Sequence, residues 1–368
     1  MSKTVFNYEP DYAVAPGEIL EETLTSRGMQ KVDLAERCGL SAKQMSLIIS
    51  GKAPVTPETA INFERALGIS ANIWNNLEAK FRLHHARKQN YEELSKHKDW
   101  LRRFPINELE RRGIIKRDDK TAKRVAQLLD FFGVGGVASW QERYERLQVA
   151  FRRSPAFKSS LEAVVTWLRI GELKAAALDC APYDKSKFDL ALNEIRRLSC
   201  KDPNVFEPRM KELCANSGVA LVFVGELPGT HLSGATRWLQ SDKALIELSL
   251  RYKTDDHLWF TFFHEAGHVK LHGKKGVFID EDKQTAFSDE EQEADQFAAN
   301  RLIPKKAYSE FIEAGEYNES NIREFAEALG IASGIVVGRL QHDGLIPWNT
   351  SLSSRLKCHF ELVEAVSE

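Results

Sequence analysis

The sequence of 368 residues is poor in cysteine, has no long uncharged hydrophobic run and carries almost no net charge, and each shortage excludes a class of protein. The five cysteines lie far apart and form no CxxC pair, so neither a disulfide framework nor a cysteine zinc site is expected. No apolar segment is long enough to cross a bilayer, and the N-terminus lacks the apolar core of a signal peptide. These absences predict a cytoplasmic protein with reduced thiols.

The charge balance limits how the chain can bind nucleic acid. Lysine and arginine number 51 against 53 aspartates and glutamates, a formal net charge of -2, so any DNA contact must come from a local patch. With 43% hydrophobic and 28% charged residues, the composition is that of an ordinary soluble globular protein. The chain is longer than a domain with a single compact core usually is, so two or three domains are expected.

Residues 16–87 have apolar residues at helical spacing, interrupted at glycines, and two consecutive segments have the pattern of a helix-turn-helix. Ala35 lies where two crossing helices need a small side chain, and Gly39 lies in the turn, where positive φ is easiest. The residues expected to form the shared core of the two helices are Leu34, Met45 and Ile48.

The second helix of this pair is expected to enter the major groove of DNA. Ser41 would cap its N-terminus, so that the polar side chains that follow lie near the end that reads base edges. Lys31, at the start of the first helix, and Lys52, just after the second, are placed to meet phosphates. The full set of expected DNA contacts is Lys31, Ser41, Lys43, Gln44, Ser46 and Lys52. The alternative is a bundle that does not bind DNA and whose surface lysines are simply solvated.

Between residues 12 and 91 the chain contains, in order, the segments PGEIL, LAERCGLS, ISGKAPVTPETA, LGIS and NIWNNLEAKF. Together they resemble the Xre-type repressors, and in particular the HigA-like antitoxins. The resemblance implies a small N-terminal domain, completed by the last of these segments, that binds operator or promoter DNA. A palindromic operator would favour a homodimer on the DNA.

Residues 91–155 are dense in arginine and lysine, with apolar residues at helical spacing between them. This pattern predicts a basic helical connector. Its charge would extend the DNA-binding surface or contact an acidic partner, although a charged run is more often a solvated helix face. The glycine-rich piece FFGVGGVASW lacks the spacing of a phosphate loop and is expected to be a turn between helices.

The segment WFTFFHEAGHVKLH contains the order HExxH. This spacing places His264 and His268 one turn apart on one helical face, so that two neutral imidazoles can bind one zinc ion. Glu265 is turned aside, where it would accept a proton from water as the general base of a peptidase. His272 lies one further turn along. A catalytic zinc keeps its fourth position open, so we expect His272 at the helix end or in support of a ligand.

Two histidines leave a zinc site short of a protein ligand. The metzincin arrangement is excluded, because lysine stands in VKLHGKK where that pattern needs its last histidine. A second helix, SDEEQEADQFAANRLIP, offers Glu290, Glu291 and Glu293. Glu291 and Asp295 lie one turn apart on the apolar side of this helix, so Glu291 would bind zinc and Asp295 would orient a histidine. The alternative is that Glu291 returns a capping-box hydrogen bond to Ser288.

Three strands are expected before the HExxH helix, in GVALVFVGELP, GATRWL and KALIELSL, after two or three helices that begin near residue 156. A small sheet of about three strands would then pack on the HExxH helix. An edge of this sheet would hold an extended peptide above the metal.

Peptide hydrolysis at such a site follows a known scheme. The zinc would polarise the scissile carbonyl, and Glu265 would take a proton from water and pass it to the leaving amine. A further group must stabilise the oxyanion, and the sequence leaves four candidates open: His231, Arg237, Tyr308 and His342.

Between residues 159 and 343 the chain contains the segments GVALVFV, RWL, LSLRYKTDDHLWFTFFHEAGHVKLH and EADQFAANRLIP. Together they resemble the ImmA/IrrE family of zinc metallopeptidases. The resemblance implies that Glu291 is the third zinc ligand, and it puts Asp295 where members often carry asparagine. It also implies a cytoplasmic regulator, because members often accompany Xre-type repressors and some cleave a repressor under stress.

Two segments after residue 316, NESNIREFAEALG and IASGIVVGRLQHDG, repeat the helix-turn-helix pattern. Ala326 and Gly330 have the spacing of the first pair and Val336 takes a core position, but Arg339 falls where a core residue is needed. We expect a degenerate pair of helices that covers the peptidase site rather than a second DNA reader.

These patterns together predict a mostly helical α+β chain. We expect a five-helix helix-turn-helix domain at 1–90, the connector at 91–155, and a zinc metallopeptidase domain with a C-terminal helical cap at 156–368. The expected function is a DNA-binding transcriptional regulator with a gluzincin-like zinc endopeptidase, holding one zinc ion, that cleaves a repressor, a toxin or itself. The alternative is an antitoxin or autorepressor in which the peptidase-like domain only senses or binds a partner.

Overall fold

The computed structural model describes residues 12–152, 159–273, 277–281 and 289–362 of the chain. The chain divides into two compact units. One is formed by residues up to 98 together with 118–126, and the other by 99–117 together with the chain from 127 onward. Each unit has a buried hydrophobic core of its own. The expected domain boundaries at residues 90 and 155 remain predictions.

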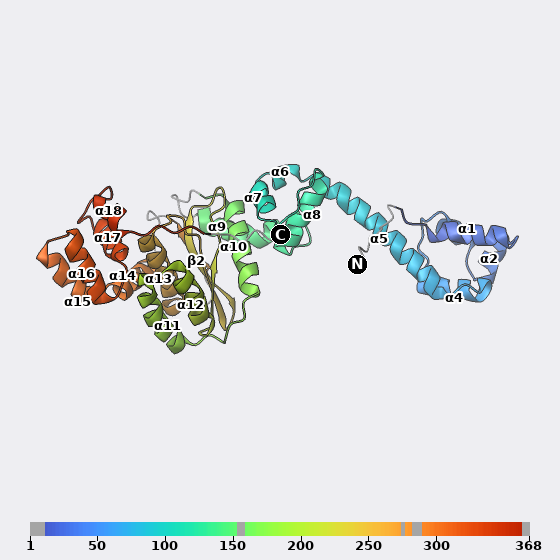
Figure 1. Ribbon diagram of the computed structural model, residues 1–368. Coiled ribbons are helices and arrows are strands. Elements are labelled where there is room, and N and C mark those ends of the chain that lie inside the picture. The colour runs from blue at the N-terminus through green and yellow to red at the C-terminus, as the bar shows by residue number, and fades with distance from the viewer. Residues whose placement is uncertain (1–11, 153–158, 274–276, 282–288, 363–368) are drawn as a thin grey trace, which may run out of the picture. The chain divides into compact units, whose positions relative to one another are not determined.

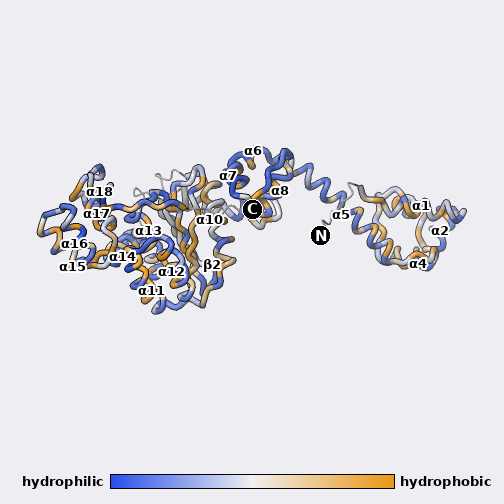
Figure 2. The backbone as a smooth tube through the Cα atoms, viewed as in Figure 1, coloured by the Kyte–Doolittle hydropathy of each residue, from blue (hydrophilic) through white to orange (hydrophobic). Residues whose placement is uncertain are grey.

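The N-terminal unit contains the five helices expected from the sequence (Figure 1). They are α1 (Pro16–Ser26), α2 (Lys31–Arg37), α3 (Ala42–Ile49), α4 (Pro57–Leu67) and α5 (Ala71–Ser95). The long helix α5 is largely hydrophilic where it extends beyond the small core (Figure 2). In the part of the chain that the structure describes, no helix is long and apolar enough to cross a membrane.

The predicted helix-turn-helix is confirmed in α2 and α3. Gly39 adopts a φ of 66° in the turn between them, as expected for a position that favours glycine. Ser41 caps α3, and its hydroxyl accepts a hydrogen bond from the Gln44 backbone N–H at 3.1 Å. The residues predicted at the crossing and in the shared core, all at most 2% exposed, are Leu34, Ala35, Met45 and Ile48.

The end of α5 and four further helices of the described residues occupy the segment expected to be a basic connector. The four are α6 (Lys98–Leu101), α7 (Ile106–Arg111), α8 (Thr121–Phe132) and α9 (Val137–Arg152). The segment is helical as predicted, and residues 133–136 form the expected turn between α8 and α9. Four aromatic rings of this segment pack on one another with centroids 4.7 to 5.7 Å apart: Trp100, Phe104, Phe132 and Trp140. This segment therefore contributes buried core to the second unit as well as a charged surface.

The second unit contains a four-stranded sheet with the order β1-β3-β2-β4. Helices α10 (Leu161–Ala176), α11 (Lys185–Arg197), η1 (Leu198–Cys200) and α12 (Pro203–Ala215) precede the strands β1 (Val219–Phe223), β2 (Leu232–Gln240) and β3 (Lys243–Leu248). Helix α13 (Asp255–Leu271) and strand β4 (Val277–Glu281) follow. β1 pairs parallel with β3, and the other two pairs are antiparallel. The three predicted strands are present, and β4, which the sequence patterns do not predict, adds an edge beside β2.

Both faces of the sheet are covered by helices, α10 on one side and α12 with α13 on the other (Figure 1). Alternate residues of β3 point to these two faces. Ala244, Ile246 and Leu248 join the large core that includes α12 and α13. Glu247 points the other way, and its carboxylate lies against Gly171 of α10. This double coverage explains why every residue of β1 is apolar and buried.

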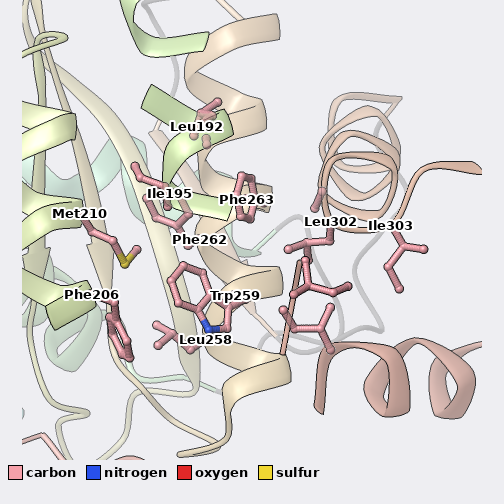
Figure 3. Packing of buried hydrophobic residues seen from close by; sticks show 14 of the residues in the cluster. Leu192, Ile195, Phe206, Met210, Leu258, Trp259, Phe262, Phe263, Leu302 and Ile303 are labelled. Atoms are coloured by element: carbon pink, nitrogen blue, oxygen red, sulfur yellow. The ribbon is translucent and has the colours of Figure 1, made fainter. Parts of the chain in front are cut away.

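Helix α13, which contains HExxH, lies in the middle of the large core (Figure 3). Trp259, Phe262 and Phe263 are fully buried. Phe206 of α12 meets the Trp259 ring edge to face, with centroids 5.3 Å apart. Close packing of large rings on several sides fixes the position of the helix, and with it the side chains one turn further along.

Among the described residues, five helices follow the sheet: α14 (Asp289–Leu302), α15 (Lys305–Ala314), α16 (Glu319–Leu329), α17 (Ser333–His342) and α18 (Ser351–Leu356). The expected second helix pair is α16 and α17, with Ala326 buried and Gly330 at a φ of 65°. Gly334 lies against α13, where an added Cβ would be 2.2 Å from Asp255 Oδ1. Because the N-terminal end of α17 is buried on α13, the structure favours a covering role over a second DNA reader.

Candidate metal centre

Three side chains from α13 and α14 converge with the spacing of a metal site. His264, His268 and Glu291 each offer one ligand atom, and these atoms lie within 4.8 Å of one another. The Nε2 atoms of the two histidines are 3.0 Å apart. Glu291 Oε2 lies 3.1 Å from Nε2 of His264, and Glu291 Oε1 lies 3.6 Å from Nε2 of His268. The structure thus brings together the three residues predicted as ligands.

Small residues allow α13 and α14 to approach closely enough for this contact. A Cβ added to Gly267 would lie 3.1 Å from Cα of Ala294. Ala294 and Ala298 are fully buried. Glu291 lies one turn before Ala294 on the same side of α14, so the packing of the small residues directs its carboxylate toward the histidines. Ser288, the proposed capping partner of Glu291, lies outside the described residues.

The second ring nitrogen of each histidine is held by another side chain. Asp295 Oδ1 lies 2.8 Å from Nδ1 of His264. Nδ1 of His268 lies 2.8 Å from Nδ1 of His272, whose Nε2 lies 3.3 Å from Glu293 Oε2. Contacts of this kind fix the ring and leave Nε2 to face a metal. The sequence places Asp295 here and allows His272 a supporting position. It offers Glu293 only as a competing ligand and does not predict its contact with His272.

Burial and hydrogen bonding act in opposite directions on the Glu291 carboxyl. Burial favours its protonated form, but the hydrogen bonds from His264 and His268 outweigh burial and lower the pKa of Glu291 to about 2. For His268, burial is the dominant cause and lowers the pKa of the imidazole. An ionised carboxylate beside a neutral imidazole is the protonation state that metal binding requires.

Glu265 lies between the predicted ligands and the sheet, and it is 0% exposed. A Cβ added to Gly234 of β2 would be 2.6 Å from Glu265 Oε1, so the glycine makes room for this carboxylate. Thr236 of the same strand donates a hydrogen bond from its hydroxyl to the Glu265 carbonyl oxygen at 3.1 Å. Neither residue of β2 has a role that the sequence patterns predict. A single glycine in a strand has several explanations, and its closeness to Glu265 depends on the tertiary fold.

The four candidates for oxyanion stabilisation lie in different places. Tyr308 and His342 line a groove that also contains Asp295. Arg237 points to the other face of the sheet, where its Nη2 donates to a backbone carbonyl of α10 at 2.8 Å. His231 directly precedes β2. Of the four, only Tyr308 and His342 therefore share a described cavity with a residue that contacts a predicted ligand.

The side chains expected to contact DNA are all exposed on the N-terminal unit: Lys31, Ser41, Lys43, Gln44, Ser46 and Lys52. Ser41 is also the cap of α3, so its position relative to the helix is fixed. Lys31 forms an ion pair with Glu21 at 2.5 Å, and about half of its side chain stays accessible. The contacts themselves remain predictions.

The donor atoms of His264, His268 and Glu291, between α13 and α14, fit a zinc ion. Nδ1 of each histidine is engaged by another side chain, so both Nε2 atoms and the Glu291 carboxylate face the same point. Three electron-pair donors that face one point suit a cation. Two histidines and one glutamate form the ligand set of many catalytic zinc sites. The roles of these side chains as ligands remain predictions.

Comparison with known proteins gives matches in two separate parts of the chain. Residues 20–74 match the helix-turn-helix family, and residues 227–341 match the IrrE N-terminal-like domain, a peptidase family. A curated relative is the uncharacterised HTH-type transcriptional regulator YddM of Escherichia coli (strain K12). It is 32% identical over 73 residues, which are 20% of this chain and 78% of the relative.

Two solved structures resemble the N-terminal part. The Pseudomonas aeruginosa antitoxin HigA with the higBA promoter is 27% identical, and the match covers 23% of this chain and 94% of that chain at a TM-score of 0.22. An addiction module antidote protein of the HigA family from Coxiella burnetii is 26% identical. That match covers 23% of this chain and 91% of the other, at a TM-score of 0.21.

Proposed function

Because the chain belongs to the helix-turn-helix family of transcriptional regulators and carries an IrrE N-terminal-like peptidase domain, we propose that it is a DNA-binding regulator with a zinc-dependent endopeptidase. Its substrate would be a regulatory protein, namely a repressor, a toxin or the chain itself. The observation that carries the proposal is the convergence of His264, His268 and Glu291 beside the buried Glu265.

Each residue of the site has a separate task in peptide hydrolysis. His264, His268 and Glu291 would hold the zinc, which when bound would supply a Lewis acid for the scissile carbonyl and the attacking water. Glu265 accepts the proton of the attacking water at its carboxylate and delivers it to the leaving amine. Asp295 keeps the His264 ring in the orientation that leaves Nε2 to the metal.

The DNA-binding role is assigned to α2, α3 and the turn after α3. Lys43, Gln44 and Ser46 lie toward the N-terminal end of α3 and are exposed, so they would meet base edges in the major groove. Lys31 and Lys52 flank α3 in the sequence and would meet phosphates. A homodimer would place two copies of α3 on a palindromic operator.

Metal analysis and cleavage assays on the purified chain test the enzymatic role. The wild type should contain about one zinc ion per chain. Glu265→Gln should retain zinc and lose cleavage of regulators encoded beside the chain, because it removes the general base but no ligand. His264→Ala should lose both zinc and cleavage. A metal-free wild type, or cleavage that survives Glu265→Gln, contradicts the enzymatic role.

A gel-shift series against the region upstream of the gene tests the DNA-binding role. Affinity should fall as salt rises, since phosphate contacts release counterions. The same series separates the second candidate function. If Glu265→Gln represses and binds a neighbouring toxin as the wild type does, and no regulator is cleaved, the chain is an antitoxin or autorepressor whose second unit only senses or binds a partner.

A further inference from the structure

A groove of about 480 Å³ lies beside the metal centre, within the second unit. Its lining comes from α13 and α14, from α15 and α17, and from Trp348. Phe260, one turn before His264, and Asp295, which lies 2.8 Å from His264, form the end nearest the predicted ligands. Sites for ligands of moderate size have volumes of about 300 to 1,000 Å³, so the groove is large enough to hold one.

One wall of the groove is a ladder of carboxamides. Gln292, Gln296 and Asn300 lie four residues apart along α14, all three are exposed, and all three line the groove. Four residues of α-helix rise about 6 Å. Two residues of an extended chain span about 6.6 Å. The spacing between successive carboxamides of the ladder is therefore close to the spacing between alternate peptide groups of an extended polypeptide.

A carboxamide has the same hydrogen-bonding groups as a peptide group. Each asparagine or glutamine side chain donates through its NH₂ and accepts through its carbonyl oxygen, and each peptide group does the same. Repeated pairing along the main chain gives affinity that does not depend on the peptide sequence. A ladder of carboxamides thus suits an extended main chain better than a single small molecule.

The floor of the groove is apolar. It is formed by Phe260, Ala299, Ile303 and Ile335. A hydrophobic side chain that leaves water for this floor would contribute to binding in proportion to its buried area. The floor therefore adds a preference for a hydrophobic residue to the sequence-independent contacts of the ladder.

The part of the groove lined by α15 and α17 is ordered through Asp343. Tyr308 donates to Asp343 Oδ2 at 2.7 Å, and Arg339 donates to the same oxygen at 2.7 Å and lies 4.6 Å from the centre of the Tyr308 ring. His342 Nδ1 lies 2.9 Å from Asp343 Oδ1. Burial acts against ionisation, but these hydrogen bonds outweigh it and lower the pKa of Asp343. A wall that is already ordered loses little conformational entropy when a ligand binds.

We propose that this groove binds an extended segment of the substrate protein on one side of the scissile bond, with its main chain on the carboxamide ladder and a hydrophobic side chain on the apolar floor. The inference rests on the proposed peptidase function, because the groove begins at Phe260 and Asp295 beside the predicted zinc ligands. The chain would then select proteins that present an extended hydrophobic segment.

A displayed library of random peptides, panned on the full-length Glu265→Gln variant, tests the groove. This variant leaves captured peptides intact. Recovered peptides should carry a hydrophobic residue, and Gln296→Leu should weaken their binding about fivefold, since it removes one net hydrogen bond. Adding Asn300→Leu should bring the loss to about 25-fold. The matched control is Gln89→Leu, an exposed helical glutamine of the first unit, which should bind as the parent does.

Main-chain recognition has a signature of its own. Methylation of one peptide nitrogen at a time should weaken binding at every second position of a recovered peptide, because alternate peptide groups would face the ladder. The inference is overturned if no sequence is enriched, as expected for a groove that takes a small molecule. It is equally overturned if Gln296→Leu and alternate methylation leave binding unchanged.

Zinc content, cleavage and melting temperature are measured on the same proteins, so that the two proposals fail separately. If zinc or cleavage is absent while peptides still bind through the ladder, the peptidase function fails and the groove remains a peptide-binding site. If the wild type cleaves its substrate and the Gln296→Leu, Asn300→Leu double variant does so with the same kcat and KM, the groove inference fails and the peptidase function stands.

Discussion

Asp295 connects the metal centre to the groove. Its Oδ1 atom lies 2.8 Å from Nδ1 of His264, and the same side chain lines the groove. A carboxylate at this distance fixes the tautomer of a ligand histidine and increases its basicity. The position one turn after Glu291 on α14 makes both contacts available at once, because the ligand and the supporting residue lie on the same side of one helix.

Replacing Asp295 should therefore weaken metal binding without removing a ligand. We expect Asp295→Ala to lower zinc affinity by about 10- to 100-fold, as measured by competition with a chromogenic chelator. Glu290→Ala is the matched control, since this exposed carboxylate lies on the same helix and is not one of the three residues that could hold the metal. Unchanged affinity in Asp295→Ala, or equal losses in the two variants, would show that Asp295 does not position His264.

Gly234 should be required for the position of the general base. The Cβ of Gly234→Ala would lie 2.6 Å from Glu265 Oε1 and 2.8 Å from Thr261 Cγ2, so the carboxylate must shift. A displacement of about 1 Å at a reacting group can cost about 100-fold in rate. We expect kcat to fall by about 10- to 100-fold while zinc content stays unchanged. Gly273→Ala, whose added Cβ meets no atom of the described residues within 4 Å, should retain wild-type kcat.

At the scale of elements, the N-terminus of α13 is held beneath α17 and the C-terminal segment. Asp255 and Asp256 are both buried. Gly334 and Gly338 of α17 lie directly against these two carboxylates, and Lys357 forms an ion pair with Asp256 at 2.6 Å. Burial, and then repulsion by Asp256, raises the pKa of Asp255 to about 7. The start of the HExxH helix therefore depends on helices that follow it by some 80 residues in the chain.

The buried Asp255 carboxyl should contribute stability to the second unit that is present in acid and lost as pH rises toward neutral. The Asp255 carboxyl ionises near pH 4 in the unfolded chain but only near pH 7 in the folded chain, so the folded state binds more protons in between. Its contribution to the free energy of unfolding is complete below about pH 4, decreases as pH rises to about 7, and amounts to a few kcal/mol at most.

Asp255→Asn keeps a neutral side chain at every pH and should therefore remove this pH-dependent loss of stability. The melting temperature of the variant should fall less than that of the wild type as pH rises from about 4 to about 7. The variant should then melt above the wild type at about pH 8. Asp99→Asn, at an exposed position of the same unit, should leave the pH dependence as it is in the wild type. Parallel curves for wild type and Asp255→Asn would mean that Asp255 ionises normally in the folded chain.

The elements that the sequence predicts well have local signals. Ala35 and Gly39 mark the first helix pair through spacing alone, and the HExxH order predicts two imidazoles on one face of a helix. Strand β4 has no comparable signal. It is defined by its pairing with β2, for example Thr236 opposite Phe278, and such a register depends on contacts between distant segments.

The metal centre divides in the same way. The spacing on α13 predicts two of the ligands. The sequence alone does not decide whether Glu291 or a neighbouring glutamate is the third, or whether Glu291 caps its helix instead. The packing of Gly267 against Ala294 determines which carboxylate reaches the histidines. Glu293 and Gly234 join the site only through contacts between separate elements. The groove is lined by four helices, so no single stretch of sequence could predict it or these two residues.

At the scale of the whole molecule, the chain combines two units with separate cores. Phe63 and Trp74 lie in the core of the first unit, and Trp259 lies in that of the second. A domain with its own core holds its site through its own packing. The exposed polar surface of α3 and the metal centre of α13 and α14 should therefore be separable by mutation.

The Lys43→Ala, Gln44→Ala double variant should lose DNA binding and keep the peptidase site. Each base contact contributes about 1 to 3 kcal/mol, so affinity for the upstream region should fall by about 30-fold or more in a gel shift at fixed salt. Zinc content and cleavage rate should match the wild type, because both side chains are exposed on the first unit. Lys306→Ala, which removes an exposed lysine of the second unit, controls for the loss of positive charge. If the double variant also lost zinc or cleavage, the two units would be coupled and the regulator would act as one switch rather than as two separable activities.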